Sequence, residues 1–156
     1  MTFYILLNQI TTMFLSMNLL TTLTFDSEIQ SYLYGGAKEE MFFQVTNNFK
    51  TLAMKPKMEG GLSNLLVITK KSKYYFDLKI EKSNTHQFIE VFDGRMTHSL
   101  TKKVENKDYE ILEGDRSILL VNKKDRPVTV NGIVVKNKEY FSKGVPILYE
   151  GIRILN

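Results

Sequence analysis

The sequence predicts an all-β protein that consists of an antiparallel β-sandwich followed by a smaller β-unit. Three observations lead to this prediction. No segment keeps the i, i+3, i+4 apolar spacing of an amphipathic helix over about ten residues. Turn-forming residues recur about every eight to twelve residues, a spacing typical of sandwiches and barrels. Several segments between these turns alternate apolar and polar side chains, as strands with one buried face do.

The clearest element is a hairpin over residues 60–80, in which an aliphatic first strand follows a Gly-Gly pair. Its second strand, Tyr74–Ile80, alternates, so that Tyr74 is expected in the core and Tyr75 on the outer face. The intervening segment Lys70–Lys73 has no apolar side chain to bury, which indicates an exposed turn. We expect this hairpin to form the centre of the sandwich.

Short runs rich in Thr, Leu and Phe precede the hairpin and suit a pleated, half-buried surface. In the third run, Ile29 and Leu33 are the expected buried positions. Pro56 is expected to end the fifth run, because proline cannot donate to a strand ladder. Residues 1–10 are expected to form a lead-in strand or arm. The strands expected in this part are Thr11–Leu19, Thr21–Phe25, Glu28–Tyr34, Met41–Val45 and Phe49–Met54.

The polar segment 81–87 has no apolar pattern and is expected to connect two domains. The N-terminal domain, the β-sandwich, would then span residues 1–82. The C-terminal domain, a unit of β-hairpins, would span residues 83–156.

The C-terminal domain contains several turn signals. Asp93–Gly94 predicts a hairpin between Phe88–Phe92 and Arg95–Leu100, because Asp-Gly is favoured in tight turns. The charged segment Lys102–Asp108 is expected to be a surface loop. Further strands are expected over Tyr109–Leu112 and Ser117–Val121, with hairpins over Val128–Val135, turning at Asn131–Gly132, and over Val145–Leu155, turning at Glu150–Gly151.

The composition excludes several kinds of chemistry. The chain has no cysteine, which removes disulfides, thiolate zinc sites and cysteine nucleophiles. The net charge is +4, but lysines are dispersed among acids and arginines are few, so we expect no direct nucleic-acid contact. Residues 1–20 are apolar, yet they contain no positive charge and are interrupted by polar side chains. This pattern favours a strand over a cleaved signal peptide and argues against a transmembrane span.

The sequence contains none of the GxSxG, HExxH, Walker or GxGxxG motifs. His86 and His98 are the only histidines, and without a ligand partner at helical spacing they are expected at the surface or in turns. Glu90, Asp93 and Asp115 could pair as carboxylates, but acids beside glycine more often support turns. We therefore predict a protein that is not an enzyme and has no catalytic residue, cofactor or metal site.

Candidate contacts with other proteins come from side chains expected to face outwards and from methionines, which suit adaptable interfaces. They are Met13, Met17, Lys70, Lys73 and Tyr75. Ordinary core filling is the alternative for the two methionines. Aromatic side chains could also stack against sugars or single-stranded nucleic acid, and the tyrosines considered for this role are Tyr32, Tyr34, Tyr74 and Tyr75.

Several motifs resemble one family. Residues 22–29 (TLTF followed by EI), 52–56 (LAMKP), 63–69 (SNLLVIT) and 75–78 (YFDL) are similar to the N-terminal β-sandwich of the ninth VirB-type subunit of type IV secretion channels. They are also similar to the TraN proteins of Bacteroidetes conjugative elements. The resemblance covers residues 19–82, about two fifths of the chain.

This resemblance implies a structural role without turnover. We expect a non-enzymatic subunit of a large assembly, either a conjugation or type IV secretion channel or a phage virion neck or tail, so its location is the virion or the periplasmic side of the bacterial cell envelope. The expected partners are copies of the chain itself, as a homo-oligomer, and neighbouring subunits. The alternative is a ligand-binding β module for carbohydrate or single-stranded nucleic acid.

Overall fold

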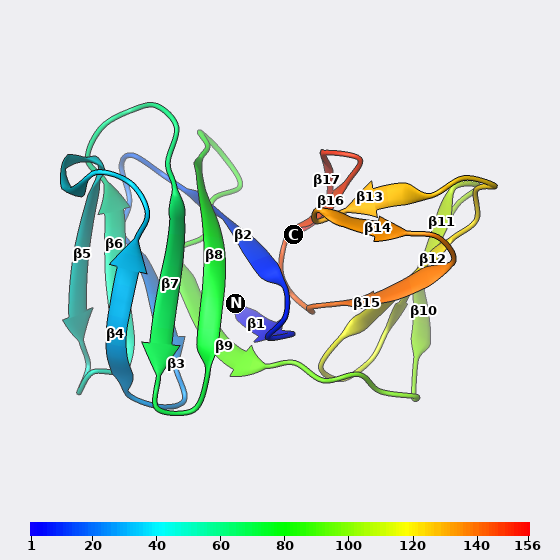
Figure 1. Cartoon of the computed structure of the whole chain (residues 1–156), viewed down its shortest axis with the longest axis horizontal. Coiled ribbons are helices and arrows are strands. Elements are labelled where there is room, and N and C mark those ends of the chain that lie inside the picture. Colours follow the sequence, from blue (N-terminus) through cyan, green and yellow to red (C-terminus); the bar gives the residue numbers. More distant parts are fainter. The chain divides into compact units, whose positions relative to one another are not determined.

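A computed structural model describes all 156 residues and confirms the all-β class (Figure 1). The chain forms seventeen strands in four sheets, and its one helical element is a short 3-10 turn, η1 (Lys38–Glu40). No helix in the structure is long and apolar enough to cross a membrane. The chain divides into two compact units. Unit 1 comprises residues 1–3 and 10–92, and unit 2 comprises residues 4–9 and 93–156.

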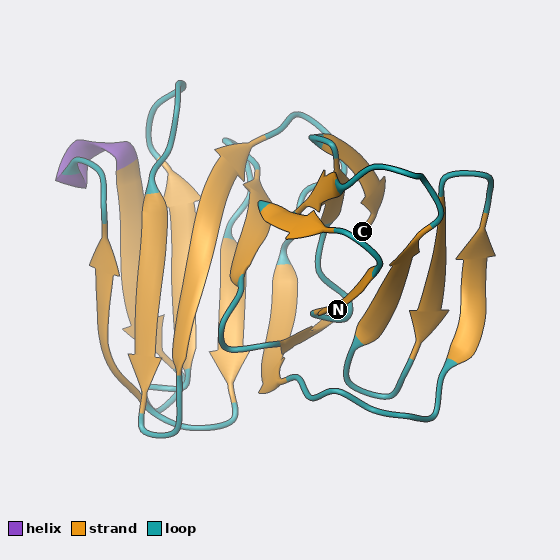
Figure 2. Ribbon diagram, turned by 45° about the vertical axis from the view of Figure 1, so that its right-hand side comes forward, coloured by secondary structure: helices purple, strands orange, loops and turns teal.

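Unit 1 is built on two sheets that pack face to face as a sandwich, with one sheet behind the other in Figures 1 and 2. Sheet A has the strand order β1 (Thr2–Ile5), β9 (Phe88–Asp93), β3 (Thr21–Phe25), β6 (Thr51–Pro56) and β5 (Met41–Thr46). Sheet B has the order β2 (Ile10–Leu15), β8 (Lys73–Ile80), β7 (Asn64–Thr69) and β4 (Ile29–Tyr34).

The predicted central hairpin is confirmed as β7 and β8, which pair antiparallel in the middle of sheet B. Tyr74, Phe76 and Leu78 are buried, whereas Tyr75 between them is exposed. The Tyr74 ring lies 5.2 Å from the ring of Phe25 in sheet A, so the two sheets meet through aromatic side chains. Each such buried side chain contributes about 1.5–3 kcal/mol of hydrophobic stabilisation.

Two strand pairs in unit 1 are parallel, β2 with β8 and β3 with β9. The predicted hairpin at Asp93–Gly94 is wrong, because no strand forms over Arg95–Leu100 and β9 lies between β1 and β3. Gly94 serves a close backbone approach instead of a tight turn. Its N–H donates to the Ile5 carbonyl at 2.7 Å, and a Cβ at Gly94 would meet the Ile5 backbone at 3.1 Å.

Unit 2 contains two four-stranded sheets. Sheet C has the order β10 (Thr101–Glu105), β11 (Tyr109–Glu113), β12 (Ile118–Asn122) and β15 (Lys138–Phe141). Sheet D has the order β14 (Ile133–Val135), β13 (Val128–Val130), β16 (Ile147–Tyr149) and β17 (Ile152–Leu155). Both hairpin turns predicted in sheet D are confirmed, with positive φ at Asn131–Gly132 (48° and 77°) and Glu150–Gly151 (48° and 80°).

Other expected boundaries change in ways that have physical causes. The loop expected over Lys102–Asp108 is largely strand β10, an edge strand that shows no apolar pattern because most of it is exposed. Charged side chains are common on such edges because they deter pairing with other chains. In unit 1, β2 ends at Leu15, and Pro56 is the last residue of β6. Strand β15 had no sequence signal.

One end of the unit 1 sandwich is sealed by the connector 81–87. The Phe14 N–H of edge strand β2 donates to Nδ1 of His86 at 3.0 Å, and the His86 N–H donates to the Phe14 carbonyl at 2.8 Å. The His86 ring also contacts the ring of Phe3 on β1, with 5.4 Å between the centroids. His86 is only 2% exposed, so the expectation of a surface or turn position is wrong for this histidine.

Replacing His86 by alanine should lower the free energy of unfolding by about 2–4 kcal/mol, because it opens a cavity and leaves the buried Phe14 N–H without an acceptor. Urea unfolding measures the change. His98→Ala is the matched control, since His98 is exposed and its loss should cost less than about 0.5 kcal/mol. Equal stabilities of the two variants would contradict the sealing role.

Candidate functional site

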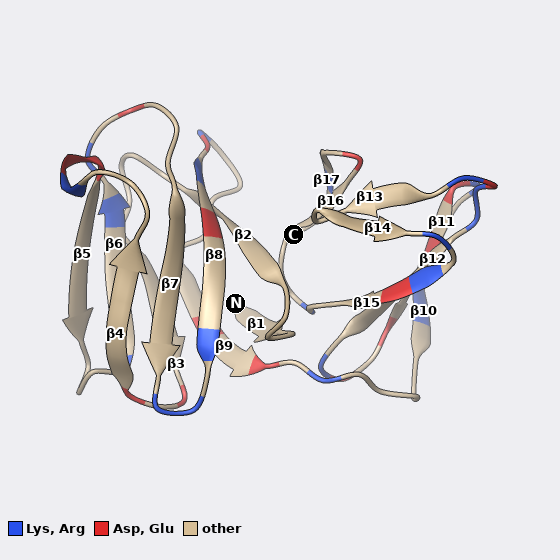
Figure 3. Cartoon of the chain, in the orientation of Figure 1, with Lys and Arg blue, Asp and Glu red and all other residues tan.

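The opposite end of the unit 1 sandwich is formed by two edge strands, β4 of sheet B and β5 of sheet A. Each pairs with one neighbour only, so each has an outer edge with no strand beside it. Neither strand contains a charged residue, and both are free of red and blue in Figure 3. We call this region the open end.

A β-bulge sets which side chains of β4 face the core. The register of β4 against β7 shifts between Ile29 and Ser31. After this shift, each side chain of β4 points to the opposite face of the sheet from the one that regular alternation would give. Leu33, expected in the core, is therefore 65% exposed. Tyr32 and Tyr34 point inwards instead, and both rings contact Phe43 of β5, at 5.3 Å and 5.5 Å between centroids.

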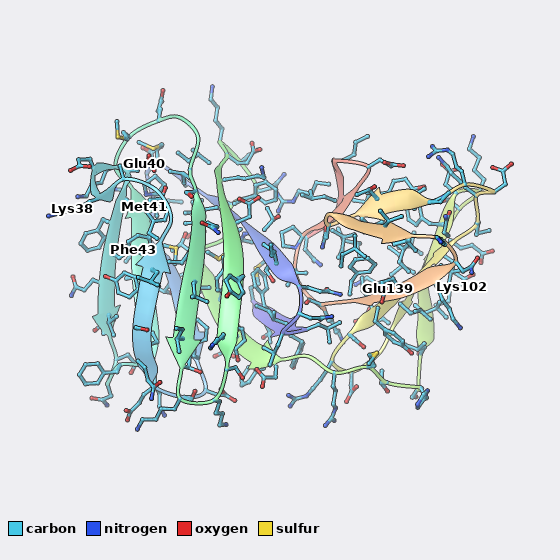
Figure 4. All side chains as sticks on the ribbon, in the orientation of Figure 1. Lys38, Glu40, Met41, Phe43, Lys102 and Glu139 are labelled. Atoms are coloured by element: carbon cyan, nitrogen blue, oxygen red, sulfur yellow. The ribbon has the colours of Figure 1, made fainter.

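The three rings line a pocket of about 410 Å³ at the open end. They are half-buried, whereas inward-facing side chains at the sealed end, such as Phe3, are fully buried. Exposed Lys38 and Lys57 supply two positive charges to the pocket lining. Lys38, Glu40, Met41 and Phe43 follow one another from η1 along β5 in Figure 4.

Tyr34 is fixed in this pocket by its hydroxyl group. The hydroxyl donates to the Glu40 carboxylate at 2.6 Å and accepts a hydrogen bond from the Ser63 N–H at 3.0 Å. Burial raises the pKa of Tyr34 above its usual value of about 10, and the hydrogen bond to Glu40 raises this pKa further. The pocket therefore has one rigid aromatic wall that stays neutral at physiological pH.

The outer face of sheet B carries an exposed apolar row that crosses all four strands. Ile10 lies opposite Tyr75, Tyr75 opposite Leu66, and Leu66 opposite Leu33. Leu66 is half-buried, and the other three side chains are exposed. We call Ile10, Tyr75, Leu66 and Leu33 the apolar band.

The structure separates the five candidate contact residues. Tyr75 is 42% exposed in the middle of the apolar band, and Lys73 lies two residues away on the same face of β8. Lys70 is also at the surface, where it pairs with Glu28 at 2.9 Å. Met13 is fully buried, as core filling requires, and Met17 is half-buried after β2.

Unit 2 has a polar pocket of about 700 Å³, lined in part by Lys102, Lys103, Glu113 and Lys143. Its lysine side chains are paired with acidic side chains. Glu113 pairs with Lys143 at 3.0 Å and with Lys103 at 3.2 Å, and the hydrogen bond from Lys143 is the main cause that lowers the pKa of Glu113. Because the lysines are already paired, this pocket is a weaker candidate for binding an anion.

The other candidate groups for catalysis or metal binding do not converge. No group of three or more His, Asp or Glu side chains is placed to hold a metal ion. Asp115 pairs with Arg95 at 3.2 Å, and the Arg95 hydrogen bond is the main cause that lowers the pKa of Asp115. His86 is used in the seal described above, and His98 is exposed.

Comparisons with known proteins add no family to these observations. No protein-family model matches the chain, and a search of curated proteins finds no match. The resemblance to the ninth VirB-type subunit and to TraN proteins therefore stays a prediction.

The sequence did not predict those residues of the aromatic pocket and the apolar band that are brought together by strands far apart in the sequence. Phe43 and Lys57 join Tyr32 and Tyr34 only because β4 and β5 are the corresponding edges of the two sheets. The available signal was the absence of charge over residues 29–34 and 41–46. Leu66 and Ile10 join Tyr75 only through the register of three strands.

Tyr34→Phe should lower the free energy of unfolding by about 1 kcal/mol, because the hydrogen bonds to Glu40 and Ser63 are lost. Tyr32→Phe is the matched control and should cost less than about 0.5 kcal/mol. Since folding raises the pKa of Tyr34, its stabilising effect should be complete below about pH 10 and decline as the pH rises through the raised pKa. Urea unfolding at a series of pH values measures this; a pH-independent difference across that range would contradict it.

Proposed function

We propose that this chain is a non-enzymatic structural subunit of a large multiprotein assembly, and that a neighbouring subunit adds an extended strand at the open end of unit 1. One observation carries the proposal: the two edge strands that form this end, β4 and β5, have no charged residue and leave core aromatic rings half-exposed. Such an end suits a sandwich that is completed by another chain.

Several other edge strands are protected by charge or by cover, and β14, an edge strand that also lacks charge, is only three residues long. Strand β10 carries Lys102, Lys103 and Glu105, and β15 carries Lys138 and Glu139, all of which discourage pairing with another strand. Strand β2 is covered by the connector 81–87. The six-residue edges β4 and β5 carry no charge, and the main-chain cover of β4 is at its first residue, where the Ile29 N–H donates to the Phe49 carbonyl at 2.7 Å. This contrast with β2, β10 and β15 supports a specific use for the open end.

The open end also provides the two things that strand addition needs. An added strand gains main-chain hydrogen bonds from the outer edge of β4 or β5, which supply affinity. The pocket lined by Tyr32, Tyr34 and Phe43 can take one of its side chains, which supplies specificity. An aliphatic or aromatic side chain suits these rings best.

The kind of assembly follows from the sequence resemblance alone. We propose either a channel of the conjugation or type IV secretion type, on the periplasmic side of the bacterial envelope, or the neck or tail of a phage virion. In both, the expected neighbours are copies of this chain and adjoining subunits.

Val45→Lys tests the role of the open end. Val45 is a half-buried residue of β5, and a lysine there should oppose strand addition by placing a charge at the edge. We expect at least about a tenfold loss of association with the native complex, measured by sedimentation of the reconstituted assembly.

Val134→Lys is the matched control, because Val134 is an exposed valine of β14 in the other unit. It should associate as the wild type does, and circular dichroism should show that both variants are folded under the conditions of the measurement. Wild-type protein that remains a monomer and enters no defined complex would contradict the proposal.

A ligand-binding role is the second candidate, and the aromatic pocket with Lys38 and Lys57 favours it. Stacking of a nucleic-acid base on such rings contributes about 1–3 kcal/mol. If this role is correct, glycan arrays or single-stranded oligonucleotides should show binding that falls about tenfold or more in Tyr32→Ala. Tyr75→Ala is the control, because Tyr75 does not line the pocket, and it should bind as the wild type does. Absence of binding to both probe sets would remove this candidate.

A further inference from the structure

The apolar band has the form of an interface that matches itself. Its four residues lie in one row across sheet B, one residue from each strand. Neighbouring strands are about 4.8 Å apart, so the row is about 15 Å long. None of its four side chains is charged, so each can be buried against an apolar surface without removing a charge from water.

Opposite charges flank the middle of the band along β8. Lys73 precedes Tyr75 by two residues and Asp77 follows it by two, and all three point to the outer face of the sheet. The two charges therefore lie about 7 Å on either side of the band. Lys73 takes no part in the ion pairs of unit 1, and Asp77 has only a long contact of 3.8 Å with Lys79.

We propose that a second copy of this chain packs with the outer face of its sheet B against the outer face of this sheet B. A two-fold axis relates the copies; it lies between the two copies of sheet B and runs parallel to the apolar band, across the strands. This axis places Tyr75 against the Tyr75 of the other copy. It reverses the direction of β8, so that Lys73 of each copy faces Asp77 of the other. A two-fold interface gives both ion pairs at once.

The charge pattern selects this arrangement over the other two-fold packing. An axis parallel to the strands would keep the direction of β8 and place Lys73 opposite Lys73 and Asp77 opposite Asp77. Like charges at an interface oppose association strongly. A second copy supplies the matching pattern by symmetry, because it carries the same uncharged row between the same two charges at the same spacing.

The size of the face indicates a weak dimer. Four strands of about six residues offer a footprint of about 400 Å² on each copy, or about 800 Å² in total, which is less than the roughly 1,000 Å² that a stable specific interface exceeds. Association should therefore depend on protein concentration and gain strength from further contacts in an assembly. The inference rests on the proposed structural role but concerns the face of sheet B, which is a different surface from the open end.

A charge-reversal experiment tests the dimer with the full chain. Lys73→Glu and Asp77→Lys should each weaken self-association at least about tenfold in sedimentation equilibrium, because each creates two like-charge contacts. When the two variants are mixed, the introduced glutamate of one copy should face the introduced lysine of the other. The unchanged Asp77 and Lys73 should also face each other, so a heterodimer should form with close to wild-type affinity. Lys55→Glu, on sheet A, is the control and should dimerise as the wild type does.

Two outcomes overturn the inference: a wild type that stays monomeric at its highest soluble concentration, or a mixture that associates no better than either variant alone. Neither outcome depends on the open end. Val45→Lys reports on strand addition separately, so that failure of the dimer and failure of the proposed function are told apart. Circular dichroism confirms that each variant is folded.

Discussion

Unit 1 depends on how the backbone groups at its sheet edges are satisfied. An edge strand presents a row of N–H and C=O groups that must be paired, covered or left to water. At one end of the sandwich, the connector 81–87 supplies both a main-chain donor and the imidazole acceptor of His86 to β2. At the other end, β4 and β5 have no strand beside their outer edges, and the Phe49 carbonyl accepts from the N–H of Ile29, the first residue of β4. The proposed role of the chain follows from this difference between its two ends.

Local chemistry explains the parts of the fold that the sequence predicted well. The hairpins at Asn131–Gly132 and Glu150–Gly151 form because their residues accept positive φ, which is decided within a few residues. Strand β8 was predicted because one side chain in two is apolar. Parallel pairing of β9 with β3 depends on residues more than sixty positions apart, and no local pattern signals it. Strand β10 escaped prediction because an exposed edge strand has no buried face to show.

The candidate surfaces were predicted only in part, for related reasons. The alternation of β8 was sufficient to place Tyr75 and Lys73 on an outer face. The bulge after Ile29 reverses the faces of β4, and nothing in the residues of β4 indicates where it falls. It exposes Leu33 and turns Tyr32 inwards, so one irregular position contributes to both the apolar band and the aromatic pocket.

The N-terminal segment has a consequence for how the chain folds. Tyr4 and Lys143 exchange two main-chain hydrogen bonds of 2.9 Å, and the Leu6 N–H donates to the Ser142 hydroxyl, so unit 2 needs residues from the start of the chain. During synthesis the Leu6 contact cannot form until Ser142, which lies 136 residues further along the chain, has left the ribosome. Contacts of such long sequence separation slow folding, because the loop must close before they form. We therefore expect this segment to dock late in the folding of unit 2, and until it docks the apolar surface that it covers is open to aggregation.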